Sequence, residues 1–266
     1  MTQKIAIFNS KGGIGKTTLT YNLASFLLNQ HKKSVLALDL DPQASLTLCA
    51  GFDSEILENT LTKAISNTIN GKEIKIGDYI LKSKSGVYMM PSDILLTKVE
   101  RQLAAETMRE FVLKRTLVGL ETIDLDYILI DSPPFLSLIT DNILTYADSV
   151  LIPIAADYLS WKAFESLAGS IKEIQSKTNP NLRIIGIVFN IADMRTFHSK
   201  DIVKFAKKKL GNNIYIFNTI IRQCTKVREA QIKAESIFEY DSDCIGFADY
   251  NSFTKEFLEV TNGKKK

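Results

Sequence analysis

The sequence contains few cysteines, and none of them falls in a metal-binding pattern. Cys49, Cys224 and Cys244 are odd in number and far apart, and the chain has no CxxC pair and no Cys/His cluster. This spacing argues against a disulfide framework and against a zinc or iron–sulfur site. Chemistry that needs bridging cysteines is therefore not expected.

Long apolar runs and a leader-like segment are also missing. No apolar stretch approaches the ~18 residues that a membrane-spanning helix requires. The first four residues lead directly into a short strand-like run, which is unlike a secretory signal peptide. We therefore expect a cytoplasmic protein without stable membrane insertion.

The 266 residues have an ordinary globular composition, with 45% hydrophobic and 24% charged residues. Short β-branched runs alternate with longer amphipathic stretches, and several of the short runs are apolar on both faces, as in buried parallel strands. The alternation predicts an α/β fold with a doubly wound, mostly parallel sheet flanked by helices. The predicted strands are residues 4–9, 35–41, 87–91, 127–131, 149–153, 183–190 and 215–221, and the predicted helices are 17–30, 95–118, 160–176 and 200–210.

The chain shows no internal repeat, low-complexity linker or clear boundary. It is therefore expected to form a single domain over residues 1–262, followed by a short basic tail, 263–266, that is disordered. The polar stretch 51–85 is expected to be a helical insertion after the second strand.

A glycine-rich segment joins the first predicted strand to the first predicted helix. Glycines allow backbone N–H groups to point inward at phosphate oxygens, and the helix N-terminus adds partial positive charge. Lys16 is placed to reach the β- and γ-phosphates of ATP, and the Thr17 hydroxyl to ligate Mg²⁺. A glycine-rich turn without a ligand would not explain why lysines and threonines fall at these positions. The predicted nucleotide-binding residues are Lys11, Gly12, Gly13, Ile14, Gly15, Lys16, Thr17 and Thr18.

Acidic residues end two other predicted strands. Asp39 and Asp41 close the second strand, and Asp131 closes the fourth. In a parallel sheet both ends lie at the carboxyl edge, beside the glycine-rich segment. Carboxylates there can hold magnesium, directly or through water, or orient an attacking water. Each aspartate alone also fits a helix cap or a turn.

Positive charge is concentrated between Arg195 and Lys233. This span has ten basic and two acidic residues, a local excess of +8. It is either a solvated lysine-rich helix face or a surface that binds a polyanion. No base-reading element is evident, so contacts with a nucleic acid would be independent of sequence. The candidate DNA-binding residues are Lys204, Lys207, Lys208, Arg222, Lys226 and Arg228.

These motifs together resemble the ParA/MinD family of ATPases. Ser10 stands where a general P-loop has Gly, and Lys-Gly-Gly-x-Gly-Lys-Thr-Thr at 11–18 is similar to the deviant Walker A motif of that family. Asp-x-Asp-Pro-Gln at 39–43 looks like its switch I, and Asp-x-Pro-Pro at 131–134 like its Walker B and switch II. The resemblance covers about residues 4–260. It is to the short, ParA/Soj-type partition ATPases without an N-terminal DNA-binding extension.

The resemblance implies roles for single residues. Lys11 would reach across a sandwich dimer to the partner's nucleotide, and Asp41 would orient the hydrolytic water. Asp39 and Asp131 would serve the magnesium environment. Asn190, after the sixth strand, would read the adenine, although capping a loop is an equally good role for it. The sequence departs from the family at Arg222, where a proline is usual, and at Ala-Gln (230–231), which replaces Ala-Pro.

The resemblance also implies an activity and partners. It predicts a slow ATPase whose ATP-bound homodimer binds double-stranded DNA without sequence preference on the nucleoid. A ParB-like protein would supply an arginine and accelerate hydrolysis. The alternatives are a cargo- or membrane-positioning ATPase of the same family, acting on a protein or lipid, and a metabolic P-loop enzyme. The end of the chain, 253–266, offers too little apolar surface for a MinD-like membrane helix.

Overall fold

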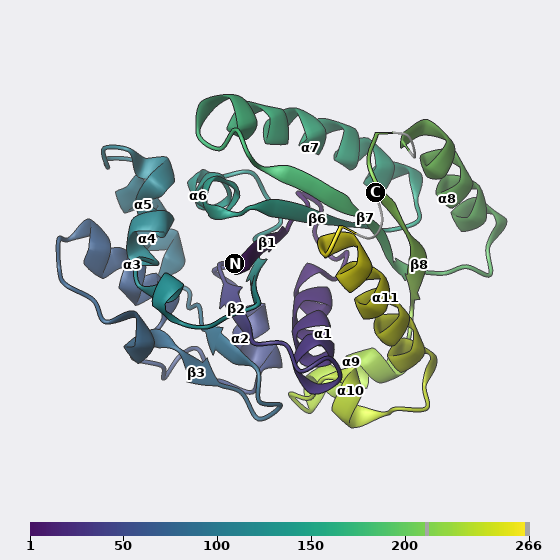
Figure 1. Ribbon diagram of the computed structural model, residues 1–266, viewed down its shortest axis with the longest axis horizontal. Helices are drawn as coiled ribbons and strands as arrows, with labels where there is room; N and C mark the ends of the chain where they lie inside the picture. Colours follow the sequence, from purple (N-terminus) through teal and green to yellow (C-terminus); the bar gives the residue numbers. More distant parts are fainter. Residues whose placement is uncertain (211–212, 264–266) are drawn as a thin grey trace.

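Helices cover both faces of a central sheet (Figure 1). The computed structural model describes residues 1–210 and 213–263, and within these the sheet has eight strands in the order β3-β4-β2-β5-β1-β6-β7-β8. Neighbouring strands are parallel, apart from β3, which runs antiparallel to β4. The strands are β1 (Gln3–Ile7), β2 (Val35–Asp39), β3 (Leu81–Lys82), β4 (Tyr88–Met90), β5 (Tyr127–Asp131), β6 (Ser149–Ile154), β7 (Arg183–Ala192) and β8 (Ile216–Arg222).

The predicted fold class and all seven predicted strands are confirmed, each strand end lying within two residues of its expected position. The stretch 51–85 is only partly helical, because it also contributes the edge strand β3. Its helical elements are α3 (Leu61–Ile69) and the 3₁₀ turn η1 (Ile76–Tyr79). Residues 264–266 of the expected basic tail lie outside the described residues.

The predicted helices at 17–30, 160–176 and 200–210 are confirmed as α1 (Lys16–Asn29), α7 (Tyr158–Lys177) and α8 (Phe197–Leu210). Other helices were not predicted. These are α2 (Ser45–Cys49), α6 (Leu138–Tyr146), α9 (Thr225–Ile232), α10 (Ile237–Tyr240), α11 (Ile245–Thr261) and the 3₁₀ turn η3 (Leu120–Thr122).

The single helix expected over 95–118 is wrong. The chain forms α4 (Leu96–Leu103), the 3₁₀ turn η2 (Arg109–Phe111) and α5 (Val112–Thr116), with Met108 at a φ of 51° between them. Asn142 of α6 stabilises the break. Its Nδ2 donates to Arg109 O at 2.8 Å, and its Oδ1 accepts from Leu113 N at 2.9 Å. A side chain distant in sequence therefore satisfies backbone groups that a continuous helix would have paired.

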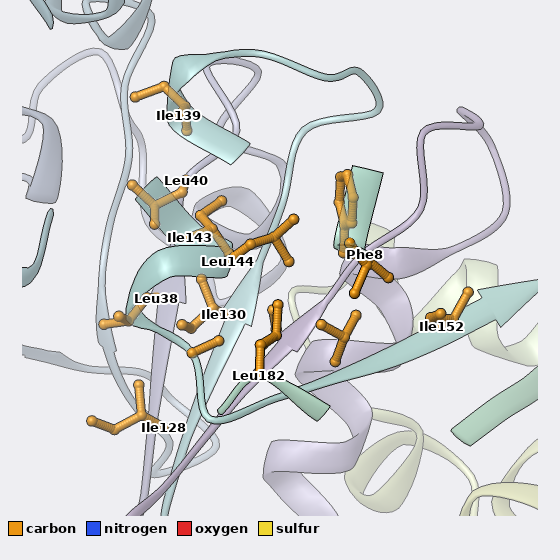
Figure 2. Packing of buried hydrophobic residues seen from close by; sticks show 14 of the residues in the cluster. Phe8, Leu38, Leu40, Ile128, Ile130, Ile139, Ile143, Leu144, Ile152 and Leu182 are labelled. Atoms are coloured by element: carbon orange, nitrogen blue, oxygen red, sulfur yellow. The ribbon is translucent and has the colours of Figure 1, made fainter. Parts of the chain in front are cut away.

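Alternating side chains of the strands divide the core into two layers. Leu36 and Leu38 face the cluster covered by α3–α8, whereas Val35 and Ala37 face the cluster covered by α1, α2 and α9–α11. Figure 2 shows the first cluster, in which strand residues such as Ile130 lie with α6 residues such as those at 139, 143 and 144. Both faces of the sheet are buried, as the doubly apolar strand pattern predicted.

The strand order brings three strand ends together. β1 lies between β5 and β6, and β2 lies on the other side of β5. The register places Asp131 opposite both Ile7 and Asp39. The loop after β1 therefore opens beside the acidic ends of β2 and β5, at the carboxyl edge where open α/β sheets bind their ligands.

In the described part of the chain, no helix combines the length and apolar character needed to cross a bilayer.

Candidate functional site

The loop between β1 and α1 adopts a conformation that depends on glycine. Gly13 and Gly15 have φ values of 74° and 76°, which side-chain-bearing residues rarely adopt. A Cβ on Gly15 would also lie 2.8 Å from Asn190 Nδ2. On the other side of the loop, Asn9 accepts a hydrogen bond from Lys11 N at 3.0 Å and donates to Pro153 O at 2.8 Å. The loop is thus held from both β6 and β7.

Asn190 fastens the end of β7 to this loop. Its Nδ2 donates to Ile14 O at 2.8 Å and to Gly15 O at 3.2 Å. Its Oδ1 is buried and has no hydrogen-bond partner among the described residues. Asn190 borders a cavity of about 80 Å³ that Thr18 and Arg228 also line. The side chain therefore holds the loop and keeps one acceptor without a hydrogen-bond partner among the described residues.

Lys16 is buried at the centre of the loop, with 6% of its surface exposed. Its Nζ donates to Lys11 O at 3.3 Å. Burial lowers the pKa of Lys16, and the nearby carboxylates of Asp131 and Asp41 oppose this effect. A polyphosphate bound in the loop would further stabilise the charged form of this lysine.

The three aspartates lie where the sequence placed them, but their contacts differ. Asp131 accepts a hydrogen bond from Thr17 Oγ1 at 2.6 Å. The Asp39 carboxylate accepts from Asp41 N at 3.1 Å and from the backbone and hydroxyl of Thr47 at 2.8 and 2.7 Å. Asp41 accepts from the backbone N of residue 43 at 2.9 Å. Asp39 therefore anchors the segment that carries Asp41.

Burial raises the pKa of Asp131 and, to about 6, that of Asp39, and the two neighbouring carboxylates reinforce the shift of Asp131. A divalent cation at this position would favour their ionised forms.

The oxygen atoms gathered here suit Mg²⁺. Thr17 Oγ1 and the Asp131 carboxylate are hard donors lying within hydrogen-bonding distance of each other. Among residues 1–210 and 213–263, no cluster of three His, Cys, Asp or Glu side chains is arranged to hold a metal. Mg²⁺ is usually held by one or two protein oxygens together with phosphates and waters, so this small donor set fits it. Because protein donors already occupy the Asp39 carboxylate, Asp39 suits an indirect role at the magnesium site.

Lys11 extends away from the loop toward the start of α7. Its Nζ lies 3.1 and 3.2 Å from the two carboxylate oxygens of Asp157 and 2.8 Å from Ser160 Oγ. Asp157 also caps α7 by accepting from Ser160 N at 2.8 Å. Burial raises the pKa of Asp157, but the hydrogen bonds from Ser160 and Lys11 outweigh this and hold it below the usual value. The spacing Asp-x-x-Ser before a helix predicts that Asp157 caps α7. Nothing in the sequence predicts that Lys11 pairs with Asp157.

The candidate DNA-binding residues lie on elements that pack on opposite faces of the sheet. α8 packs on the sheet face covered by α3–α7, whereas α9 packs on the opposite face with α1 and α11 (Figure 1). Lys204, Lys207 and Lys208 are exposed on α8, and Lys207 donates to Asn218 at 3.3 Å. Basic residues that are adjacent in sequence are therefore divided by the β8 edge of the sheet.

Two of these charges are also neutralised. The Arg222 side chain donates to Asp249, with Nε at 2.9 Å, and Lys226 pairs with Glu229 at 2.9 Å. Within the described residues, Lys204, Lys207, Lys208 and Arg228 form no ion pair. Of the six candidates, these four keep the most charge available for a partner, because the hydrogen bond of Lys207 goes to a neutral amide.

Comparisons with known proteins agree with this geometry. A family model described as an AAA domain matches residues 2–184. The chromosome-partitioning ATPase Soj of Treponema pallidum is 32% identical, over 97% of this chain and 98% of that protein. The sporulation initiation inhibitor protein Soj of Bacillus subtilis is 31% identical, over 96% of this chain and 98% of that protein.

A solved structure shows the same fold. A cobyrinic acid a,c-diamide synthase from Mycobacterium smegmatis, crystallised with ADP and magnesium, superposes with a TM-score of 0.83 at 27% identity, over 100% of this chain and 98% of that one. Full-length similarity to the Soj proteins, together with the glycine-rich loop and its aspartates, shows that the chain belongs to the ParA/Soj family of P-loop ATPases.

Proposed function

We propose that this chain is a DNA-partition ATPase. Its P-loop binds ATP with Mg²⁺, as in the family to which it belongs, and its ATP-bound sandwich dimer holds double-stranded DNA without sequence preference. Hydrolysis is slow in the isolated protein, and a ParB-like partner stimulates it and so releases the DNA. The observation that carries this proposal is the position of Lys11 at the rim of the nucleotide loop, beside exposed apolar side chains.

Those apolar side chains lie on the segments that flank the nucleotide site. Phe135 and Leu136 follow β5, and Tyr158 and Leu159 begin α7; Leu159 is 70% exposed. Exposed apolar residues grouped beside a charged site are typical of a protein-binding surface. A second copy placed against this edge would cover them and bring its own Lys11 toward the facing nucleotide, which is the arrangement that the sandwich dimer requires.

The residues of the loop have distinct tasks in hydrolysis. Lys16 neutralises the charge that develops on the γ-phosphate. Asp41 orients the attacking water, and Asp39 fixes the backbone of Asp41 through the 3.1 Å hydrogen bond. Thr17 and Asp131 hold the magnesium ion, which supplies further charge neutralisation.

Asn190 favours adenine over guanine. Because both protons of Nδ2 are used by Ile14 O and Gly15 O, only the free Oδ1 can face a base. The 6-amino group of adenine can donate to it, whereas the O6 of guanine would place two acceptors together. The side chain therefore serves both as a fastener of the loop and as a reader of the base.

The DNA surface rests on Lys204, Lys207 and Lys208 of α8 and on Arg228 of α9. A single copy offers few phosphate contacts, and two-fold symmetry doubles them. Because the affinity of a protein for DNA rises steeply with the number of phosphates it neutralises, dimerisation switches DNA binding on. Arg222 and Lys226 contribute less than the sequence suggested, because acidic neighbours already neutralise them.

Light scattering and fluorescence anisotropy with a labelled duplex test the proposal together. With ATP and Mg²⁺ the chain should double in mass and bind the duplex, and with ADP or without nucleotide it should do neither. A dimer that forms with ATP but ignores DNA would favour the cargo- or membrane-positioning alternative. A monomer in every nucleotide state would contradict the sandwich.

A further inference from the structure

An amide from the last quarter of the chain reaches the helix that carries the nucleotide loop. Gln231 of α9 donates through Nε2 to Thr18 Oγ1 at 2.7 Å, although the two residues are 213 positions apart. The same Nε2 lies 3.7 Å from the sulfur of Cys49 in α2. Thr18 and Gln231 both border the cavity beside Asn190. Gln231 is thus fixed between the loop helix, the helix after switch I, and the cavity.

The direction of this hydrogen bond determines where the threonine proton points. An amide nitrogen can only donate, so Thr18 Oγ1 must accept. The hydroxyl keeps its single proton, and within the described residues it has no acceptor for it. At the N-terminal turn of a helix that binds phosphate, the natural acceptor is a phosphate oxygen of the nucleotide. Donation from Gln231 also polarises the hydroxyl and strengthens its own donation.

α9 and α10 are held on α1 along a polar stripe, which keeps Gln231 in place. Thr18, Asn22 and Ser25 are spaced so that they lie on one side of α1. Asn22 Oδ1 accepts from Ile237 N at 2.8 Å, and the Ser25 hydroxyl lies 2.8 Å from that of Ser236. Of the three contacts, that of Thr18 alone lies in the first turn of the helix, next to the phosphates.

We propose that Gln231 is a positioning residue of the nucleotide site, which orients the Thr18 hydroxyl so that it donates to a phosphate of ATP or ADP. The inference deepens the proposed function and rests on its nucleotide-binding part alone, not on DNA or dimerisation. The family resemblance predicts a proline at position 231. Proline has no side-chain hydrogen-bond donor. The contact is therefore a property of this chain rather than of the general motif.

Titration calorimetry with Mg·ADP and Mg·ATP measures the effect. Gln231→Leu and Thr18→Val should each weaken nucleotide affinity roughly three- to tenfold. The double variant should be no weaker than Thr18→Val, because the two residues act through one hydroxyl. Turnover at saturating ATP should change less than the Michaelis constant, as expected when uniform binding is removed.

The matched control is Ser25→Ala, which removes another contact between α1 and the α9–α10 segment but leaves the Thr18 hydroxyl intact. It should leave nucleotide affinity unchanged. A decrease equal to that of Gln231→Leu would show that docking of the segment is what matters, and would overturn the inference. Unchanged affinity in Gln231→Leu, or additive decreases in the double variant, would overturn it too.

Gln231→Glu provides a variant of the same size. Its carboxylate accepts a hydrogen bond from the Thr18 hydroxyl, which reverses the direction of the bond, and it adds negative charge. The ratio of the variant's nucleotide affinity to that of wild type should therefore be lowest at pH 8. The ratio should recover as the pH falls toward the pKa of the glutamate, since the protonated acid can donate again. A ratio independent of pH would contradict the assigned direction. Failure of the wild type itself to bind nucleotide would instead contradict the proposed function.

Discussion

Lys11 and Asp157 form an ion pair at 3.1 Å within one copy of the chain. The same lysine is the residue proposed to reach the nucleotide of a second copy. Both side chains are about one-third exposed, and such pairs contribute at most about 1 kcal/mol. The pair is thus weak enough to be exchanged for a phosphate, and the proposed dimer would give Lys11 a second, competing partner.

Asp157→Asn should release Lys11 and promote ATP-dependent dimerisation. The amide oxygen can still cap α7, so the fold is retained while the competing charge is removed. We expect the ATP concentration that gives half-maximal dimer to fall by up to roughly fivefold, as measured by light scattering. Ser160→Ala is the companion variant, because it removes the hydroxyl contacts with Lys11 and Asp157 but leaves the charge pair between them. A need for more ATP in Asp157→Asn would show that the pair supports the dimer instead.

Lys16→Ala and Lys11→Ala should separate binding from dimerisation. Loss of Lys16 removes the buried charge facing the phosphates and should weaken ATP binding at least about tenfold. Loss of Lys11 should leave ATP binding by the monomer nearly intact but prevent the dimer. Calorimetry measures ATP binding, and sedimentation velocity measures dimerisation. A Lys11→Ala protein that dimerises normally with ATP is incompatible with the sandwich.

Asp41→Ala should trap the ATP state. The carboxylate is proposed to orient the attacking water, a role that typically contributes about 10²–10⁴-fold to the rate. Phosphate release should fall accordingly while ATP affinity is retained, and the dimer should persist. Asp39→Asn makes a useful comparison, because it disturbs the backbone of Asp41 indirectly and should slow hydrolysis less. Unchanged turnover in Asp41→Ala would remove this residue from the mechanism.

Glu256 should make stability depend on acidic pH. Its carboxylate accepts five hydrogen bonds, from Tyr215, Asn218 and Thr219. Burial alone would raise the pKa of Glu256. The hydrogen bonds outweigh burial, so the pKa of Glu256 lies below the ordinary 4.5. A depressed carboxyl pKa stabilises the fold above the unfolded value, and this stabilisation is lost as the pH falls through the folded value.

Glu256→Gln turns one acceptor into a donor facing other donors. It should lower the melting temperature at pH 7 by roughly 2–8 °C. The difference from wild type should shrink as the pH is lowered below 4.5. Thermal unfolding followed by circular dichroism over this pH range measures it. A difference that stays constant with pH would assign the effect to packing rather than to charge.

Local patterns were sufficient to predict seven of the eight described strands and the edge at which the site forms. β5, for example, is apolar on both faces, and its last residue, Asp131, lies where the parallel register must bring it beside Asp39. The glycine-rich loop was equally predictable, because each of its residue types has a direct physical task.

Contacts between distant segments were not predictable. The break at Met108 depends on Asn142, and the neutralisation of Arg222 depends on Asp249. The run of basic residues looked continuous because sequence spacing does not show that α8 and α9 cover opposite faces of the sheet. The sequence marked Gln231 only as a departure from the family pattern, since only the folded chain places it next to Thr18.

The affinity for a DNA duplex measured against salt concentration, with ATP and Mg²⁺ present, tests the central claim most directly. The affinity of wild type should fall steeply as the salt concentration rises. Lys208→Ala and Arg228→Ala should each bind more weakly to every DNA sequence. The salt slope should be lowered by about one for each phosphate that a subunit no longer neutralises. Both variants should still dimerise, and Lys114→Ala, on α5, should behave as wild type. Unchanged affinity and slope in both variants would contradict a DNA-binding dimer built on this surface.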